Sequence, residues 1–346
     1  MKKLKKVLFI CKKRNDSYGP SYGLINSCKF ISNALEDNGI ESKVVDVIDN
    51  NYIDREVHNF KPTHVFIEAI WVVPEKIKVL LKLYPKIQWY VRIHSKIPFI
   101  SNEGIAIGWL REYGEISKVY KNFSIAANNE EISEAFYKCY KIKIEYFPNI
   151  YHPKHHNHHY DDEQENNHCH EECNSQKINI GCFGSIRPLK NQLIQAMAAI
   201  AFGNQLKCSI NFHVNGNRCE QNGDNVLKNL INSFKNTPHN LICHPWLSHS
   251  DFVNLVKKMD LGLQVSISET FNIVAADFAW NNVPIVGSDE ISWLDRRYKA
   301  NPNSLSDITD KLHYSFLGKK HNIQKFNLEN LQKFNKKATK IWLHSL

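Results

Sequence analysis

The chain has 346 residues, 42% of them hydrophobic and 11% aromatic, which is enough for two globular domains of ordinary size. No apolar run approaches the roughly 20 residues that a membrane-spanning helix needs, and the nine cysteines lack the regular spacing of a disulfide framework. The net charge of +9 suits an anionic partner, whether a nucleotide, a nucleic acid or a membrane surface, and equally a basic surface without a partner.

The start of the chain predicts an intracellular protein. Four lysines precede the apolar run 7–11 as in a signal peptide, but that run is too short for a signal sequence and is typical of a first β-strand. The scattered cysteines indicate reduced thiols, most of them small core residues. We therefore expect a cytoplasmic location.

Strands and helices alternate through residues 1–150, as in an α/β domain with a parallel sheet. Ligands bind at the carboxyl edge of such a sheet. The loop with Gly19 and Gly23 follows the first strand and His94 follows the fourth, so both belong to that edge, although a lone histidine is more often structural than functional. We predict strands at 7–11, 42–47, 64–68, 88–93, 123–127 and 144–149, and helices at 24–36, 75–83 and 102–113.

Residues 151–177 break this alternation, because they contain seven of the 17 histidines and hardly any apolar side chain. Such a composition cannot bury enough surface to order itself, so we expect a linker or an exposed insertion. His168, Cys169, His170 and Cys173 offer metal ligands, but zinc sites usually pair two-ligand knuckles within a folded module. That pairing is missing, and a linker without a structural metal is the favoured interpretation.

From residue 178 the alternation restarts and predicts a second α/β domain that extends to residue 320. Residues 321–346 form a C-terminal helix that can pack back on the N-terminal domain. The predicted architecture is thus two doubly wound, Rossmann-like domains that face each other across a cleft. We expect strands at 178–183, 208–214, 241–243, 261–265 and 283–288, and helices at 192–202, 224–234, 248–259, 272–280, 304–316 and 328–344.

Two loops of the second domain have the composition of an anion site. Arg187 and Lys190 flank the start of the first helix, so two cations and a helix N-terminus meet there. The strand-to-helix turn 266–277 carries Glu269 on the loop and Asp277 in the helix. The amides of 270–272 lie at or near that helix N-terminus, where a phosphate is favoured.

The sequence 184–191, Gly-Ser-Ile-Arg-Pro-Leu-Lys-Asn, followed by the segments 244–247, 268–277 and 283–286, resembles the C-terminal domain of retaining GT-B glycosyltransferases. That group includes sucrose synthases and bacterial mannosyl- and glucosyltransferases. Residues 1–150 agree in architecture and in His94, and the segment 91–99 is similar to a type of glycosyltransferase encoded by tailed phages.

The resemblance implies a role for each matching position. Arg187 and Lys190 would neutralise the donor diphosphate, Glu269 would accept hydrogen bonds from the donor sugar, and His94 would approach that sugar from the N-terminal domain. Asp277 stands where the group has a ribose-binding glutamate, whose side chain is one methylene longer. The other implied donor-binding positions are Gly184, Ser185, Asn191, Trp246, Leu247, Thr270, Phe271 and Asn272, and the acceptor side comprises Tyr18, Gly19, Tyr22 and Gly23.

The expected function is the retaining transfer of a hexosyl or pentosyl group from a nucleotide-diphosphate sugar, with UDP or GDP as the nucleotide, to an acceptor hydroxyl. The resemblance implies no cofactor and no metal. The acceptor is left open among carbohydrate, lipid, protein and DNA that carries hydroxymethylated pyrimidines. A non-catalytic scaffold that binds a nucleotide sugar is the alternative outside enzymes.

Overall fold

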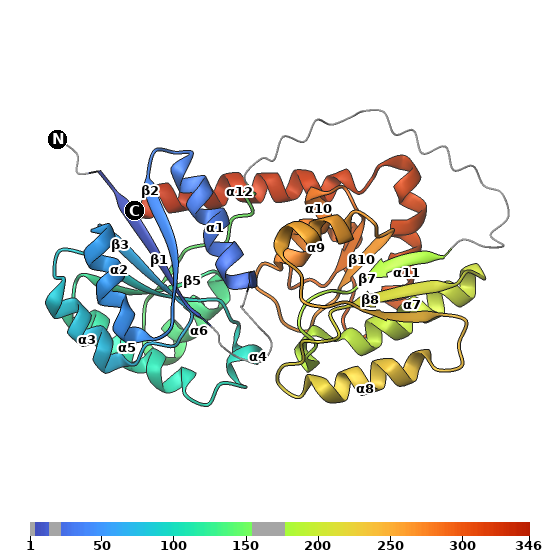
Figure 1. The fold of residues 1–346 in the computed structure, drawn as a ribbon, viewed down its shortest axis with the longest axis horizontal. Coiled ribbons are helices and arrows are strands. Elements are labelled where there is room, and N and C mark those ends of the chain that lie inside the picture. The colour runs from blue at the N-terminus through green and yellow to red at the C-terminus, as the bar shows by residue number, and fades with distance from the viewer. Residues whose placement is uncertain (1–3, 14–21, 154–176) are drawn as a thin grey trace.

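Two parallel β-sheets, one in each half of the chain, form the centres of two α/β domains (Figure 1). The computed structural model describes residues 4–13, 22–153 and 177–346. The domains lie side by side, and the last helix, α12 (Lys325–Ser345), runs along both of them. The predicted α/β class with two doubly wound domains is confirmed.

The N-terminal sheet has six parallel strands in the order β2-β1-β3-β4-β5-β6. Its central strands are continuous apolar runs because helices cover both faces, and Val7 to Cys11 are all fully buried. The strands are β1 (Lys6–Lys12), β2 (Glu41–Val47), β3 (His64–Glu68), β4 (Gln88–Ile93), β5 (Phe123–Ala127) and β6 (Ile144–Tyr146). The helices are α1 (Tyr22–Glu36), α2 (Ile53–Phe60), α3 (Pro74–Leu83), α4 (Ile97–Ile100), α5 (Ala106–Val119) and α6 (Glu130–Tyr140), with a 3-10 turn at Asn50–Tyr52.

The C-terminal sheet has five parallel strands in the order β11-β10-β7-β8-β9. The chain order reverses between β7 and β10, and loops that leave two such strands diverge to open a crevice at the carboxyl edge. The strands are β7 (Ile178–Gly181), β8 (Ile210–Val214), β9 (Asn240–Cys243), β10 (Leu261–Gln264) and β11 (Ile285–Gly287). The helices are α7 (Gln192–Leu206), α8 (Gly223–Phe234), α9 (His249–Val256), α10 (Ile273–Trp280) and α11 (Leu305–Gly318), with 3-10 turns at Pro188–Lys190, Arg296–Tyr298 and Lys319–His321.

Some predicted boundaries are wrong for local reasons. The helix expected at 102–113 is α5, which starts later because a one-turn helix, α4, with a proline near its start precedes it. The sequence analysis missed α6, although Asn129 caps it by accepting a hydrogen bond from the amide of Ile132 at 3.1 Å. The strands predicted at 178–183 and 261–265 end at Gly181 and Gln264, so the residues that follow belong to loops at the sheet edge.

Helix α12 fastens the end of the chain to the N-terminal domain. Its Trp342 is fully buried, donates a hydrogen bond from Nε1 to the carbonyl of Pro148 at 2.8 Å and packs against the rings of Phe9, Phe66 and Phe147. The buried Arg92 guanidinium lies 5.4 Å from the centroid of the same indole. The C-terminal segment therefore contributes to the core of the first domain as well as to that of the second.

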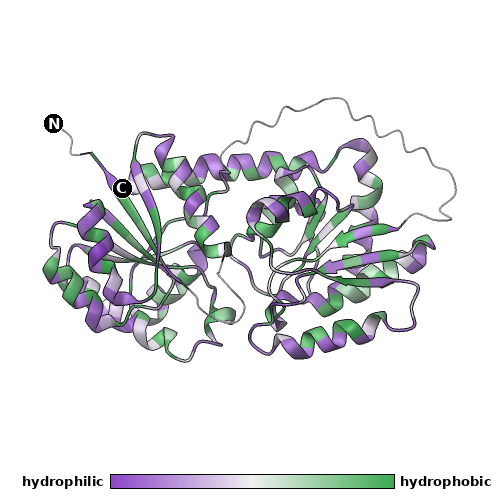
Figure 2. Cartoon of the chain, viewed as in Figure 1, coloured by the Kyte–Doolittle hydropathy of each residue, from purple (hydrophilic) through white to green (hydrophobic). Residues whose placement is uncertain are grey.

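Apolar residues concentrate on the strands of both sheets and on the helix faces that meet them, and hydrophilic residues dominate the outer helix faces (Figure 2). Within the described ranges, no helix combines the length and the apolar character that crossing a membrane requires.

Candidate functional site

A cleft with a volume of about 340 Å³ lies between the two domains and is lined by both. Its walls are loops and helix starts at the carboxyl edges of the sheets, where the sequence predicted a ligand. The predicted residues that line it are Gly23, His94, Gly184, Ser185, Arg187, Lys190, Trp246, Glu269, Thr270 and Asn272. The fold thus brings these residues together from five separate parts of the sequence.

Lys190 and Glu269 form an ion pair on the C-terminal wall, and Ser266 also donates a hydrogen bond to Glu269, with Oγ and Oε1 3.3 Å apart. Lys190 ends the 3-10 turn that follows the loop after β7, and Glu269 lies on the loop after β10. Gly184 has a φ of +111°, which L side chains rarely adopt, so glycine allows the sharp turn before the cations. The charges expected to meet a diphosphate and a sugar are therefore paired with each other.

Arg187 contacts both domains. Its guanidinium lies 4.8 Å from the ring centroid of Phe99 on α4, and its Nη1 is 3.4 Å from Oε2 of Glu220. Its buried Nε has no hydrogen-bond partner among the described residues. A buried N–H without a partner is costly, and an anionic ligand would satisfy it.

Arg218 is a further cation in the cleft that the sequence analysis missed. It is 3% exposed, lies 4.5 Å from the ring centroid of Trp246 and donates a hydrogen bond from Nε to Glu220 at 2.9 Å. It follows β8 by four residues, so its position at a strand's carboxyl end was the available signal. Glu220 lies between two arginines and lowers the net positive charge of this wall.

Helix α10 begins at Ile273, one residue later than predicted. Asn272 is its N-cap: it has a φ of 60°, and its side chain accepts a hydrogen bond from the amide of Ala275 at 2.8 Å. The first amides of the helix are those of Ile273 and Val274, which line the cleft. The side chain of Phe271 packs in the core against Trp293 and Phe334, so it lies away from the cleft.

His94 rests on a buried ion pair of the N-terminal domain. Glu68 and Arg92 are both fully buried, their Oε2 and Nη1 are 3.0 Å apart, and His94 Nε2 bonds the same carboxylate oxygen. Burial and the Arg92 charge lower the pKa of His94, although Glu68 opposes them. Burial raises the pKa of Glu68, but Arg92 and His94 outweigh it and the pKa is lowered. A neutral imidazole that donates from Nε2 to an ionised Glu68 follows.

Direct bonds join the two walls of the cleft. Asn128 donates to the hydroxyl of Thr270 at 2.9 Å, and that hydroxyl is 3.4 Å from the carbonyl oxygen of His94. Lys96 Nζ lies 3.1 Å from Glu290 of the C-terminal domain and 2.8 Å from Glu131. Burial lowers the pKa of Lys96, but the two glutamates outweigh it and the pKa is raised. The conformation is therefore held by polar contacts around the predicted donor sugar position.

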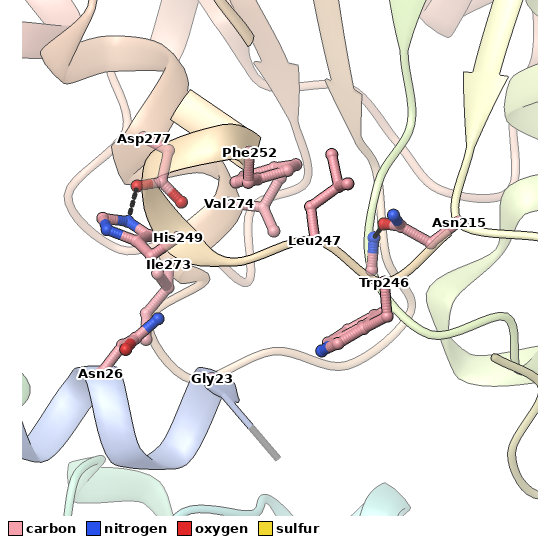
Figure 3. Close-up of a pocket in the computed structure, with 11 residues that line it drawn as sticks. Gly23, Asn26, Asn215, Trp246, Leu247, His249, Phe252, Ile273, Val274 and Asp277 are labelled. Carbon is pink, nitrogen blue, oxygen red and sulfur yellow. Dashed lines mark hydrogen bonds and ion pairs between the residues drawn. The ribbon is translucent and has the colours of Figure 1, made fainter. Parts of the chain in front are cut away.

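A second hollow of about 110 Å³ adjoins the cleft and has mainly apolar walls (Figure 3). Trp246 and Leu247, both predicted, lie on one side of it, and Asp277 lies on the opposite side next to His249. The sequence analysis missed His249, which starts α9 and is 2.7 Å from Asp277. The other walls come from Gly23, Asn26, Gly184, Asn215, Phe252, Ile273 and Val274.

Some predicted residues lie elsewhere. The side chain of Asn191 donates to the carbonyls of Val265 and Pro302, at 3.2 and 2.8 Å, so it fixes the loop. Tyr22 begins α1, whereas Tyr18 and Gly19 lie outside the described residues, as do His168, Cys169, His170 and Cys173. Among the residues that the structure describes, no group of three or more histidine, cysteine or acidic side chains could hold a metal ion.

No protein-family model matches the sequence, and no curated protein does. Solved structures match the fold over nearly the whole chain. The trehalose-6-phosphate structure from E. coli bound with UDP-2-fluoro glucose has a TM-score of 0.65 at 11% identity over 98% of both chains. A glycosyltransferase from Rickettsia africae has a TM-score of 0.60 at 14% identity over 98% of both chains. Sucrose-phosphate synthase from Thermosynechococcus elongatus has a TM-score of 0.62 at 9% identity over 99% of this chain and 98% of its own.

These likenesses define the fold. Two parallel α/β domains that face each other across a cleft, with a C-terminal helix that returns to the first domain, are the GT-B fold.

Proposed function

We propose that this protein is a glycosyltransferase that moves a hexosyl or pentosyl group from a nucleotide-diphosphate sugar to an acceptor hydroxyl. A fold hosts many functions, so the proposal rests on the site. The observation that carries it is the convergence of Arg187, Lys190, Glu269 and His94 on one cleft from opposite domains. In this proposal the diphosphate and the sugar bind in the cleft, and the nucleoside binds in the adjoining hollow.

The donor diphosphate would lie against Lys190, Arg187 and the first amides of α10. Lys190 is paired with Glu269 and Arg187 with Glu220, so the phosphates would replace carboxylates as partners of these cations. Cations fixed before the reaction stabilise the charge that develops as the diphosphate leaves. Because side chains and amides meet this charge, the proposed reaction needs no metal ion.

The donor sugar would lie between Glu269 and His94. Released from Lys190, Glu269 can accept hydrogen bonds from sugar hydroxyls, and His94 stands on the opposite wall with its ring fixed by Glu68. The nucleoside would enter the apolar hollow between Trp246 and Asp277. UDP and GDP are the nucleotides to test first. The similarity in fold to a solved structure that contains UDP-2-fluoro glucose supports UDP.

We further propose that transfer retains the anomeric configuration. The acceptor hydroxyl would attack from the face that the diphosphate leaves, and a leaving phosphate oxygen would take its proton. In this complex Glu269, released from Lys190, would accept hydrogen bonds from the donor sugar, so we assign it to holding the sugar rather than to removing the proton of the acceptor. Closing the cleft would exclude water and so suppress hydrolysis of the donor.

A thermal-shift screen with UDP-, GDP-, ADP- and dTDP-sugars tests the donor. A ligand that binds only the folded protein raises the melting temperature, so we expect a rise with UDP- or GDP-sugars in the wild type and in the control Lys228→Ala. Lys228 is exposed on α8, outside the cleft lining. Lys190→Ala should abolish the rise, and the absence of a shift with every nucleotide sugar would contradict the proposal.

With the donor known, acceptors are compared under the same conditions. Mono- and oligosaccharides, a lipid, a peptide and duplex DNA with hydroxymethylated cytosine are each incubated with radiolabelled donor. Salt-sensitive labelling of the DNA alone would assign the DNA acceptor, and labelling of a saccharide alone would assign a carbohydrate acceptor. Binding of a donor that is never cleaved would identify a non-catalytic scaffold.

A further inference from the structure

Asp277 is held in a buried hydrogen-bond network at the wall of the apolar hollow. Tyr151 Oη donates to Asp277 Oδ1 at 2.6 Å, and His249 Nε2 lies 2.7 Å from the same oxygen. The residue is 1% exposed, yet it lines the hollow. Its other carboxylate oxygen, Oδ2, has no hydrogen-bond partner among the described residues, and the bond from His249 to Oδ1 is drawn in Figure 3.

The two residues that bond Oδ1 are themselves immobilised by packing. The Phe30 ring lies 4.7 Å from Tyr151 and 5.4 Å from His249, measured between ring centroids. Tyr151 is also tied to α12, because its amide donates to Asn335 Oδ1 at 2.9 Å and its carbonyl accepts from Asn335 Nδ2 at 2.7 Å. The direction of the Asp277 carboxylate is therefore fixed by three parts of the chain that are distant in sequence. Tyr151 and His249 of α9 bond it directly, and α12 holds Tyr151 through Asn335.

We propose that His249 and Tyr151 are positioning residues of the nucleoside subsite, which fix the Asp277 carboxylate so that its free oxygen accepts a hydrogen bond from a ribose hydroxyl. This inference rests on the proposed function, since it assigns the nucleoside of the donor to this hollow. Because the aspartate side chain is short, Asp277 can reach a ligand only if its carboxylate is held in a suitable orientation. Two donors on Oδ1 would hold it there and leave Oδ2 as the acceptor.

The charges around the network support this assignment. Burial lowers the pKa of His249, but the hydrogen bond and charge of Asp277 outweigh it and the pKa is raised, while Lys29 on α1 opposes the rise. Burial and the charge of Asp277 raise the pKa of Tyr151 well above its usual value, so its hydroxyl remains a donor. Both groups can therefore donate a hydrogen bond to Asp277 Oδ1.

The test is calorimetric titration of the full chain with UDP and GDP and with their 2′-deoxy and 3′-deoxy analogues. The wild type should bind one ribonucleotide about tenfold more tightly than a deoxy analogue, as expected for one hydrogen bond to a charged group. Tyr151→Phe and His249→Ala should reduce this ratio towards one. His249→Gln, which keeps a side-chain N–H donor, should restore part of it.

A matched control separates positioning from loss of stability. Asn281 Nδ2 donates to the backbone carbonyl of Asp277 at 2.7 Å and does not touch the carboxylate. Asn281→Ala should therefore lower the melting temperature and keep the wild-type ratio. Tyr151→Phe removes a single oxygen atom and provides the result if His249→Ala does not fold.

Three outcomes would overturn the inference. A wild type that binds a ribonucleotide and its deoxy analogues equally well refutes it and leaves the proposed donor intact. The inference is also refuted if Tyr151→Phe and His249→Ala both keep the wild-type ratio of ribonucleotide to deoxynucleotide affinity while Asp277→Ala loses it; this result too leaves the proposed donor intact. A wild type that binds neither UDP nor GDP contradicts the donor proposal and this inference together.

Discussion

At the scale of single residues, charged side chains that line the cleft form ion pairs with one another. Lys190 pairs with Glu269, and Glu220 pairs with both Arg187 and Arg218. An anion that binds in the cleft must therefore compete with a carboxylate for each cation. Partly buried pairs of this kind cost stability when one partner is removed, because the remaining charge is left without compensation. Substitutions here should therefore affect folding as well as ligand binding, and the two effects have to be measured separately.

Removing the Glu269 charge should slow turnover strongly. We expect Glu269→Gln to lower kcat/KM by about a hundredfold or more, the loss typical of removing one preorganised electrostatic contact. Gln keeps the shape, so the circular dichroism spectrum should be unchanged. Asp251→Asn, a carboxylate change at an exposed position of α9, serves as the control. Equal kcat/KM in wild type and Glu269→Gln would contradict the assigned role.

Acid should destabilise the N-terminal domain through His94. The pKa of His94 is lowered from its ordinary 6.5 in the folded state, so the unfolded chain binds more protons in the window just below 6.5. The free energy of unfolding should then fall as the pH drops from 7 to 5. Glu68, whose pKa is lowered from 4.5, loses its contribution only at more acidic pH.

Urea denaturation at pH 7, 6 and 5 measures this dependence. His94→Gln should show a flatter decline than the wild type, because it no longer takes up a proton on unfolding. His64 and His213, whose burial lowers their pKa values to about 4, contribute equally to both proteins and cancel in the comparison. Parallel pH profiles would show that His94 does not titrate on unfolding.

At the scale of elements, the turn between β10 and α10 depends on Asn272. Its side chain caps the helix through Ala275 and also donates to Gln264 at 2.9 Å, while its backbone has the left-handed φ that asparagine tolerates. The cap defines the start of α10 at Ile273, and Ile273 and Val274 line the cleft, so the local fold and the proposed phosphate site depend on one side chain.

Loss of this cap should weaken both stability and binding. Asn272→Ala should lower the free energy of unfolding by about 1–2 kcal/mol, the cost of a lost cap, and should also weaken nucleoside diphosphate binding. Asn272→Gly tolerates the positive φ and should cost less than alanine. Urea denaturation and calorimetric titration of the two variants provide the comparison, and an alanine variant as stable as the wild type would contradict the assignment.

Element positions could largely be predicted from the sequence, because buried parallel strands are continuous apolar runs. Parallel strands also place their carboxyl ends at one edge of a sheet, which is why Lys190 and Glu269 could be expected at one edge of the second sheet and His94 at the corresponding edge of the first. Contacts made only by tertiary packing could not be predicted. Nothing near His249 in the sequence shows that α9 lies against Asp277, and Tyr151 meets Asp277 across 126 positions.

At the scale of the whole molecule, α12 and the polar contacts between the walls hold the two domains together. Trp342 is the largest anchor of α12 in the N-terminal core. Trp342→Ala should lower the free energy of unfolding by about 3–5 kcal/mol, as large-to-small changes at buried aromatic positions do. Trp342→Phe should cost less, because it retains most of the buried ring.

The two Trp342 variants are compared by urea denaturation and by small-angle X-ray scattering. Because α12 joins the cores of both domains, the alanine variant should also have a larger radius of gyration than the wild type. An unchanged radius together with a small loss of stability would show that the polar contacts at Lys96 and Thr270 hold the domains without α12.

The activity that we propose is cleavage, in the cleft, of the bond between a sugar and a nucleoside diphosphate. Time-resolved proton NMR of the protein with the donor that raises its melting temperature tests this most directly. We expect release of the nucleoside diphosphate, with the freed or transferred sugar first appearing in the donor's anomeric configuration, and a release by Glu269→Gln that is slower by about a hundredfold or more. The proposed activity would be contradicted if the wild type bound the donor tightly but released nucleoside diphosphate from it no faster than Glu269→Gln does.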